Sequence, residues 1–219
     1  MSLQTELRNF QAGWRERVGE DVAARVAAAN DRLAANGLLN RVRKAGDRFP
    51  DVVLPDHTGR PVRISDRLAS GPLVINFYRG GWCPYCNLEL RAYGGALDLL
   101  HLAGGDLIAV SPEKPDHVSA TIGKNDLRFT VLSDTESRLS DALGIRFDLD
   151  DDIIALYRKF GHDLPEHNGD GRWSLPIPAT YVVGGDGLIA LAHIDPDYRN
   201  RLEPQEAIAM IRRLSGQAH

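Results

Sequence analysis

The chain has 219 residues, of which 43% are hydrophobic and 26% charged, as in ordinary globular proteins. Its net charge of -4 gives no basic field for nucleic acid or anionic lipid, and no apolar run approaches the length of a membrane span. The N-terminus lacks the basic start and apolar core of a secretory signal. We therefore expect a cytoplasmic protein with neither nucleic acid nor membrane as partner.

Residues 1–45 predict a helical arm, because apolar side chains recur there at spacings of three and four. Gly13 and Gly19 weaken the helix, and Asn36-Gly37 favours a stop. The apolar face consists of Leu3, Leu7, Phe10, Trp14, Val18, Val22, Val26, Ala29 and Leu33. This pattern suits an arm that folds onto its own domain and equally one that lies across a second subunit of a homodimer.

Residues 46–219 predict one α/β domain. The run 73–78 is rich in β-formers and bounded by glycine and proline, which predicts a buried central strand. Strands at 106–110 and 129–132 alternate with three helices. These helices are expected at 84–103, from 111 to about 123, and at 136–143. The alternation is typical of parallel strands.

The last third of the chain is less regular. Residues 147–173 predict an irregular, partly helical insert. Two further strands, 179–183 and 188–193, flank the sequence Gly-Gly-Asp-Gly, which is a strong hairpin signal. A final helix is expected to begin at about Pro204.

Both cysteines of the chain, Cys83 and Cys86, lie in one C-x-x-C at the point where the central strand turns into a helix. A thiolate is the nucleophile of thiol redox chemistry, and a helix N-terminus stabilises negative charge. Pro84 suits the first helical position. We expect Cys83 to be exposed at the helix start as the attacking thiolate. Cys86, one turn later and better shielded, is then expected to resolve the mixed disulfide.

Four neighbouring side chains are candidates for shaping this site. Arg79 adds positive charge if it folds back toward the thiols. Trp82 and Tyr85 flank the cysteines, either as a contact surface for a partner polypeptide or as packing of the turn. Glu89, one turn beyond the second cysteine, is our candidate for accepting a thiol proton, although a first-turn glutamate also serves as a partner of the helix dipole.

Other interpretations of the C-x-x-C remain open. A zinc site needs two more ligands, for which His162 and His167 form the best-spaced pair, and such a site would make the chain a non-catalytic binding module or redox sensor. Inert buried thiols and a structural disulfide are two further alternatives. The redox hypothesis, which we favour, requires no metal and no cofactor.

Several blocks of the sequence resemble the peroxiredoxins, the alkyl hydroperoxide reductase and thiol-specific antioxidant (AhpC/TSA) family. The blocks are residues 46–56, Cys86-Asn87-Leu88-Glu89-Leu90, Val110-Ser111-Pro112-Glu113, Leu132-Ser133-Asp134 and Pro178-Ala179-Thr180-Tyr181-Val182-Val183. The resemblance implies a thioredoxin-like fold, a central mixed sheet flanked by helices, here with an N-terminal helical extension. It also implies an antioxidant oxidoreductase whose substrate is a protein disulfide or a small peroxide and whose reductant is of the thioredoxin or glutathione type.

The chain departs from the family pattern Pro-x-x-x-Thr-x-x-Cys in an informative way. If Cys86 is aligned with the family's peroxidatic cysteine, the proline position holds Arg79 and the threonine position holds Cys83. The family's second arginine falls at Pro178. Trp-Cys-x-x-Cys and Pro178 are instead similar to the motif and the cis-proline of thioredoxins, in which that proline faces the dithiol.

Two assignments of the cysteines follow from these resemblances. The leading hypothesis is a dithiol–disulfide oxidoreductase in which Cys83 attacks. The alternative is a thiol peroxidase in which Cys86 attacks peroxide and Cys83 resolves. Tyr198 and Arg199, near the C-terminus, carry no role that the sequence resolves.

Overall fold

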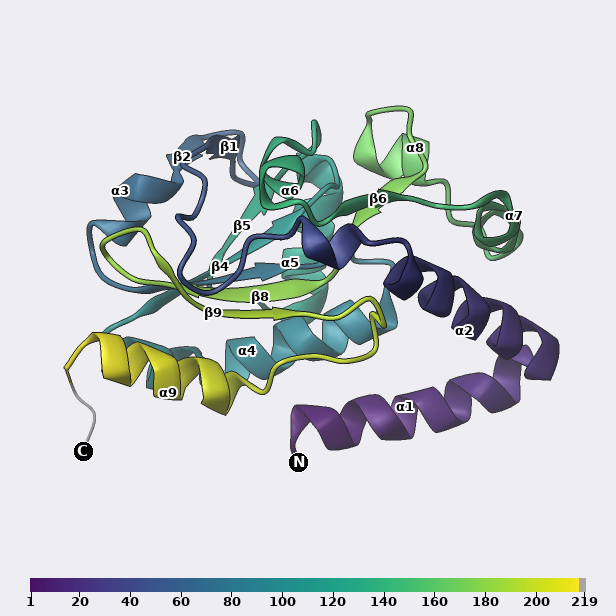
Figure 1. The fold of residues 1–219 in the computed structure, drawn as a ribbon, viewed down its shortest axis with the longest axis horizontal. Coiled ribbons are helices and arrows are strands. Elements are labelled where there is room, and N and C mark those ends of the chain that lie inside the picture. Colours follow the sequence, from purple (N-terminus) through teal and green to yellow (C-terminus); the bar gives the residue numbers. More distant parts are fainter. Residues whose placement is uncertain (217–219) are drawn as a thin grey trace.

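A five-stranded mixed sheet forms the centre of the molecule in the computed structural model, which describes residues 1–216 (Figure 1). Its strand order is β5-β4-β3-β8-β9. The strands are β3 (Leu73–Phe77), β4 (Asp106–Ser111), β5 (Thr130–Ser133), β8 (Ala179–Val183) and β9 (Ile189–Ile194). The first three run parallel, as predicted, whereas β8 and β9 form the expected hairpin and pair antiparallel.

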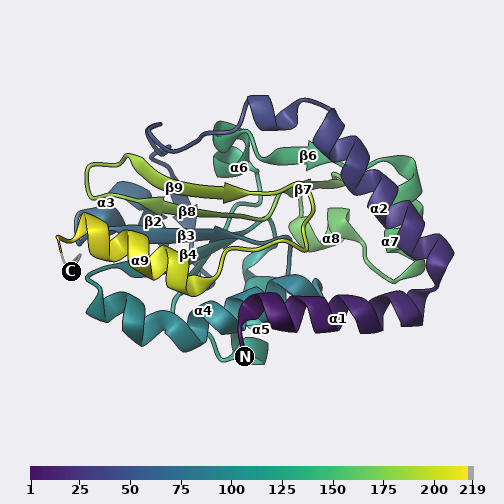
Figure 2. The same ribbon diagram turned by 60° about the horizontal axis from the view of Figure 1, so that its bottom comes forward.

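Helices cover both faces of this sheet. On one face lie α4 (Pro84–Leu102), α5 (Pro115–Asn125) and α9 (Pro204–Leu214), and on the other lie α3 (Ile64–Leu68) and α6 (Arg138–Leu143) (Figures 1 and 2). Each face has its own apolar core. The thioredoxin-like fold that the resemblance implied is therefore confirmed.

The central strand β3 contributes side chains to both cores. Val74 points to the core beneath α4 and α9, whereas Leu73, Ile75 and Phe77 point to the opposite core. Successive side chains of a strand face opposite sides, so a strand buried on both faces is apolar at nearly every position, with Asn76 as the exception here. All residues of β3 are buried accordingly.

Short elements complete the domain. They are η1 (Leu38–Asn40), β1 (Val53–Pro55), β2 (Pro61–Arg63), β6 (Arg146–Asp148), α7 (Asp151–Lys159), α8 (Leu164–Asn168) and β7 (Ser174–Pro176). The partly helical insert is thus two short helices, α7 and α8, between the paired strands β6 and β7. No helix in residues 1–216 is long and apolar enough to cross a membrane.

One predicted helix start was wrong. We expected a helix to open at Ser111-Pro112, but β4 continues to Ser111 and α5 begins only at Pro115. A residue before proline avoids the helical conformation, and Lys114 is accordingly extended, with ψ at 153°. The helix therefore starts at Pro115, four residues later than expected, with this proline in its first turn.

The N-terminal arm is two helices rather than one: α1 (Leu3–Val18) and α2 (Glu20–Ala35). The break falls at Gly19, whose φ of 81° is a conformation that other residues rarely adopt. Gly13, the other weak point, remains inside α1. The break lets the two helices lie on different parts of the domain.

Both arm helices pack on the domain of the same chain (Figure 2). Leu3 and Leu7 of α1 enter the core beneath α4, and Val22 and Val26 of α2 form a smaller apolar cluster with α7. Of the two arrangements left open by the sequence, the structure shows the arm folded onto its own domain. A homodimer remains a prediction.

Candidate active site

The C-x-x-C occupies the junction between β3 and α4. Cys83 is the N-cap of α4, and Pro84 takes the first helical position, as expected. Both cysteines are free thiols, and the exposed fraction of each is 0%. The expectation that Cys83 is exposed was therefore wrong, because Arg79 folds back over it and aromatic side chains from distant segments close the site.

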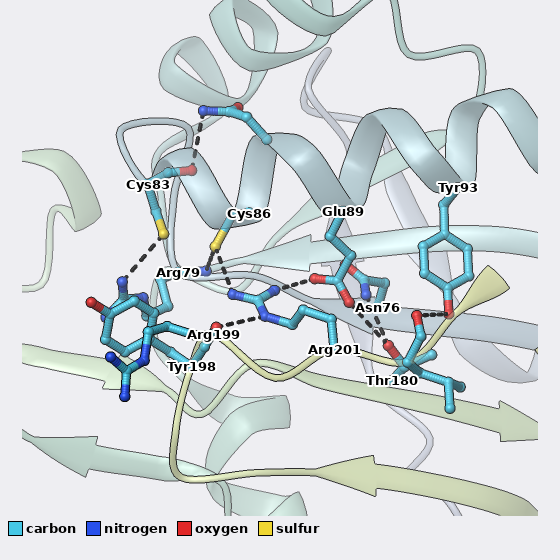
Figure 3. Close-up of polar contacts among 12 residues, drawn as sticks. Asn76, Arg79, Cys83, Cys86, Glu89, Tyr93, Thr180, Tyr198, Arg199 and Arg201 are labelled. Carbon is cyan, nitrogen blue, oxygen red and sulfur yellow. Dashed lines mark hydrogen bonds and ion pairs between the residues drawn. The ribbon is translucent and has the colours of Figure 1, made fainter. Parts of the chain in front are cut away.

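Arg79 holds the sulfur of Cys83. Its Nη2 donates to Cys83 Sγ at 3.2 Å (Figure 3). Its Nη1 donates to Tyr157 Oη at 3.0 Å. The ring of Tyr198 lies 3.7 Å from the guanidinium carbon. Arg79 is only 6% exposed and has no carboxylate partner within residues 1–216. The positive charge of Arg79 beside Cys83 Sγ therefore favours the thiolate form of this cysteine.

Arg201 serves the second cysteine from the loop before α9. Its Nη2 donates to Cys86 Sγ at 3.5 Å, while its Nη1 forms an ion pair with Glu89 (Figure 3). The backbone N–H of Arg79 also donates to Cys86 Sγ, at 3.4 Å. Arg201 and Glu89 are both fully buried. Because Glu89 already balances the charge of Arg201, this arginine favours ionisation of Cys86 less strongly.

The pKa values of the two thiols separate in opposite directions. Burial opposes ionisation of Cys83, but its interaction with the Cys86 thiol and the charges of Arg79 and Arg201 outweigh burial and hold the pKa of Cys83 well below its ordinary value. Burial, together with the neighbouring Cys83, raises the pKa of Cys86 well above its ordinary value. The surroundings therefore favour the thiolate form of Cys83 over that of Cys86.

Glu89 does not reach the sulfur of Cys86 directly. Its carboxylate pairs with Arg201 and accepts from Thr180 Oγ1 at 3.5 Å, and Thr180 accepts in turn from Asn76 Nδ2 at 3.0 Å. Burial raises the pKa of Glu89 although Arg201 opposes the shift. No direct contact with the sulfur supports its predicted role as proton acceptor. Glu89 instead acts on Cys86 through Arg201, which contacts both.

The aromatic neighbours of the motif pack against other rings of the protein and do not project into solvent. Tyr85 is 3% exposed, and its ring makes edge contacts with Phe10 of the arm at 5.1 Å and with Tyr198 at 5.4 Å. Trp82 is half-buried against Tyr157. For Tyr85, the structure therefore favours packing of the turn over a contact surface for a partner.

Pro178 precedes β8 and lines the same cavity as Arg79. All peptide bonds of the described residues are trans, including the bond that precedes Pro178. The similarity to the thioredoxin proline is one of position along the chain.

Sequence reasoning missed Arg201, Tyr157 and Tyr198. The family's second arginine is absent at Pro178, and Arg201 places a guanidinium against Cys86 from beyond β9 instead. The one available signal was the loss of a cation where the resemblance requires one.

A buried carboxyl, Glu113, also lies beside the active-site turn. It accepts from the backbone N–H of Gly81 at 2.9 Å and from Ser111 Oγ at 3.4 Å, and it is 2% exposed. Burial raises the pKa of Glu113 to about 7, against the opposing effect of the Gly81 N–H. This turn therefore carries a carboxyl that titrates near neutrality.

The histidines do not complete a metal site with the cysteines. The ring of His162 lies 4.9 Å from Trp82, and His167 stacks on His117 at 4.5 Å. Within residues 1–216, His117, Glu166 and His167 bring ligand-type atoms within 4.8 Å, and no such group of three includes a cysteine. The two stacked rings are 13° from parallel, so their nitrogen lone pairs do not converge on one ion. The zinc alternative finds no support in this geometry.

A thioredoxin fold with a buried pair of free cysteines at a helix start defines a thiol-based oxidoreductase. A model of the AhpC/TSA family matches residues 45–192, and the chain belongs to that family.

Individual relatives are peroxiredoxins. The chain is 27% identical to chloroplastic peroxiredoxin Q of Sedum lineare over 176 residues, which cover 80% of this chain and 79% of the relative. It is 33% identical to peroxiredoxin Bcp of Escherichia coli over 102 residues, 47% of this chain and 65% of the relative. Among solved structures, peroxidoxin BcpB of Mycobacterium tuberculosis superimposes with a TM-score of 0.62 at 20% identity, covering 78% of this chain and 97% of that one. The chain is thus a peroxiredoxin-like, thiol-dependent enzyme.

Proposed function

We propose that the protein is a thiol peroxidase in which the thiolate of Cys83 attacks a peroxide and Cys86 resolves the product. The observation that carries this assignment is the buried guanidinium of Arg79, whose anionic partner is Cys83 Sγ at 3.2 Å. A buried cation without a carboxylate stabilises the thiolate beside it, and the thiolate is the reactive form. The same guanidinium is placed to donate to a peroxide oxygen.

The chemistry proceeds in two steps. The Cys83 thiolate attacks one peroxide oxygen, the O–O bond breaks, and the departing alkoxide takes the proton of the Cys86 thiol to leave as an alcohol, or as water from hydrogen peroxide. Cys83 is now a sulfenic acid. The Cys86 thiolate, beside Arg201, attacks the sulfenic sulfur, and hydroxide departs and is protonated by solvent. A thioredoxin-type dithiol then reduces the disulfide and becomes oxidised itself.

The burial of the sulfurs favours a peroxide over a protein disulfide as the oxidant. Both cysteines are 0% exposed, so a polypeptide disulfide cannot touch either sulfur in this conformation. A small peroxide needs only a narrow path. Dithiol–disulfide exchange, the leading hypothesis from the sequence, then becomes the second half of the cycle, in which the reductant restores the dithiol. Because a protein reductant meets the same burial, this half requires the disulfide form to expose a sulfur.

Two observations favour the reverse assignment. Cys86 Sγ accepts from two N–H groups, the Arg79 amide and Arg201 Nη2, and it holds the position that resembles the peroxidatic cysteine. In that version Cys86 attacks and Cys83 resolves.

Mass spectrometry of Cys83→Ser and Cys86→Ser after one equivalent of hydrogen peroxide separates the two assignments. We expect Cys86→Ser to form a sulfenic acid at Cys83, Cys83→Ser to react far more slowly, and the unaltered protein to form the internal disulfide. A sulfenic acid formed rapidly at Cys86 while Cys83 stays inert would establish the reverse assignment. If neither variant nor the unaltered protein consumes peroxide, the chain is not a peroxidase.

A further inference from the structure

A cavity of about 320 Å³ lies between the N-terminal arm and the domain. One wall is the face of α2 that carries Val26, Ala29 and Leu33, and α7 supplies Ile153 and Tyr157. These two helices lie side by side in Figure 2. Most of the lining is apolar, as in pockets that bind small organic molecules.

Arg79 lines this cavity, and its guanidinium lies over the ring of Tyr198, another lining residue. The same guanidinium donates to Cys83 Sγ at 3.2 Å. A molecule in the cavity is therefore separated from the reactive sulfur by one side chain. Of its N–H groups, Nε has no partner in the described residues and remains available to an oxygen. Neither cysteine lines the cavity, so Arg79 is the link between the cavity and the sulfur of Cys83.

Hydrogen peroxide does not account for an apolar cavity beside the thiolate. It consists of two hydroxyl groups and makes no use of apolar walls. The wall supplied by α2 also lies outside residues 45–192, the part that matches the family model. This chain therefore adds an apolar surface to the dithiol by means of its own arm.

The charged residues that line the cavity are all paired. Arg32 pairs with Asp150 at 2.6 Å, Asp148 pairs with Arg146 at 2.9 Å, and Arg79 is balanced by Cys83. The lining thus leaves no spare cation for a carboxylate on the ligand. The complementary occupant is an uncharged organic group.

We propose that this cavity binds the organic body of an uncharged hydroperoxide and directs its O–O bond to Arg79 and Cys83, so that the arm sets the substrate preference. The proposal rests on the peroxidase function proposed above. It assigns α2 as a specificity element, with Ala29 at the centre of the wall.

The test compares two tryptophan substitutions on adjacent residues of α2. Ala29→Trp fills the cavity, whereas Ala28 lies on the exposed face of the same helix outside the cavity lining, so Ala28→Trp is its matched control. The measured quantity is kcat/KM for cumene hydroperoxide divided by kcat/KM for hydrogen peroxide. We expect Ala29→Trp to lower this ratio by about tenfold or more, since contacts in an apolar pocket discriminate by roughly 10–200-fold.

Ala29→Leu adds a smaller side chain and is expected to lower the ratio by an intermediate amount, which keeps the test valid if the tryptophan variant does not fold. An unchanged ratio in both Ala29 variants, or an equal change in Ala28→Trp, would overturn the assignment of the cavity. If the unaltered protein consumes neither peroxide, the proposed function itself fails. Turnover of hydrogen peroxide with no preference for cumene hydroperoxide refutes the cavity alone.

Discussion

At the scale of single residues, each cysteine of the dithiol contacts its own buried arginine. Arg201 has a carboxylate partner, Glu89, whereas Arg79 has only sulfur, phenol and aromatic neighbours in the described chain. Removing charge from water is costly unless an opposite charge is near. The unequal pairing therefore favours the negative charge on Cys83 over Cys86.

Replacing Arg79 by glutamine tests this division. We expect the pKa of Cys83, held low in the unaltered protein, to rise, because the variant loses the positive charge beside it. The thiolate then protonates at a higher pH, so the acid limb of the peroxide reaction moves upward in pH. The oxidation rate at neutral pH should fall by about tenfold for each unit by which the pKa exceeds the working pH.

Ultraviolet absorbance of the thiolate and stopped-flow oxidation rates, both against pH, measure this effect. Arg199→Gln is the matched control, since Arg199 lies nearby but pairs with Asp197. A titration in Arg79→Gln that matches the unaltered protein would contradict the assignment of the thiolate.

Glu113 predicts a pH dependence of stability. Its pKa rises from 4.5 in the unfolded reference to about 7 in the fold, mainly through burial. Below about pH 4.5 both states are protonated; as the pH rises toward about 7 the unfolded state ionises first, so this group's contribution to stability is lost. As the pH rises from about 4.5 to about 7, the Glu113→Gln variant should therefore become more stable than the unaltered protein, by on the order of 3 kcal/mol.

Urea unfolding of both proteins across the pH window checks this expectation. Glu136→Gln, an exposed glutamate paired with Arg138, serves as the control. The same pH profile for the Glu113 and Glu136 variants would show that Glu113 ionises normally in the fold.

At the scale of elements, the break at Gly19 allows the two helices of the arm to pack on different parts of the domain. Helix α1 docks beneath α4 and helps to enclose Tyr85 through Phe10, whereas α2 crosses to α7 and forms the cavity wall. One continuous helix could not follow both surfaces. The ion pairs between α2 and α7 are partly exposed and contribute little, so the apolar cluster at Val22 and Val26 is the main contact.

Leu7→Ala measures the docking of α1. Leu7 is 3% exposed in the main core, and truncating a buried leucine costs about 2–5 kcal/mol. Asn9→Ala, on the exposed side of the same helix, should change the free energy of unfolding by no more than about 0.5 kcal/mol. Denaturant titration gives both values, and equal effects would mean that α1 does not pack on this domain in solution.

At the scale of the whole molecule, the arm and the domain share one core. The cluster beneath the sheet joins residues from α1, α4 and α9, so the arm's apolar face is not a separate folding unit. A shared core makes unfolding cooperative. In the same core, segments from several parts of the chain enclose the dithiol.

We expect the arm and the sheet to unfold in a single transition. Trp14 on α1 reports the arm when Trp82 and Trp173 are replaced by phenylalanine, and circular dichroism of this variant reports the remainder. Coincident midpoints in urea are the expected result. An earlier loss of the Trp14 signal would show that the arm detaches independently, and the cavity would then open with it.

The order and type of most elements could be predicted, because strand and helix patterns and turn residues are local properties of the sequence. The boundary at Lys114 and the division of the arm at Gly19 were harder to place, since a proline or glycine permits several local solutions. The family resemblance extended the prediction to the mixed sheet. It could not supply the replacement for the arginine that is missing at Pro178.

By itself, the sequence determined the dithiol at the start of a helix, with Cys83 as N-cap and Pro84 behind it, because these positions depend on residues within one turn. Only the tertiary structure decided that both sulfurs are buried and that each cysteine has its own arginine. The contact between Arg201 and Cys86 joins residues 115 positions apart, and the cavity needs a wall from the arm. No local pattern encodes such contacts, since they exist only once the distant segments have packed against the sheet.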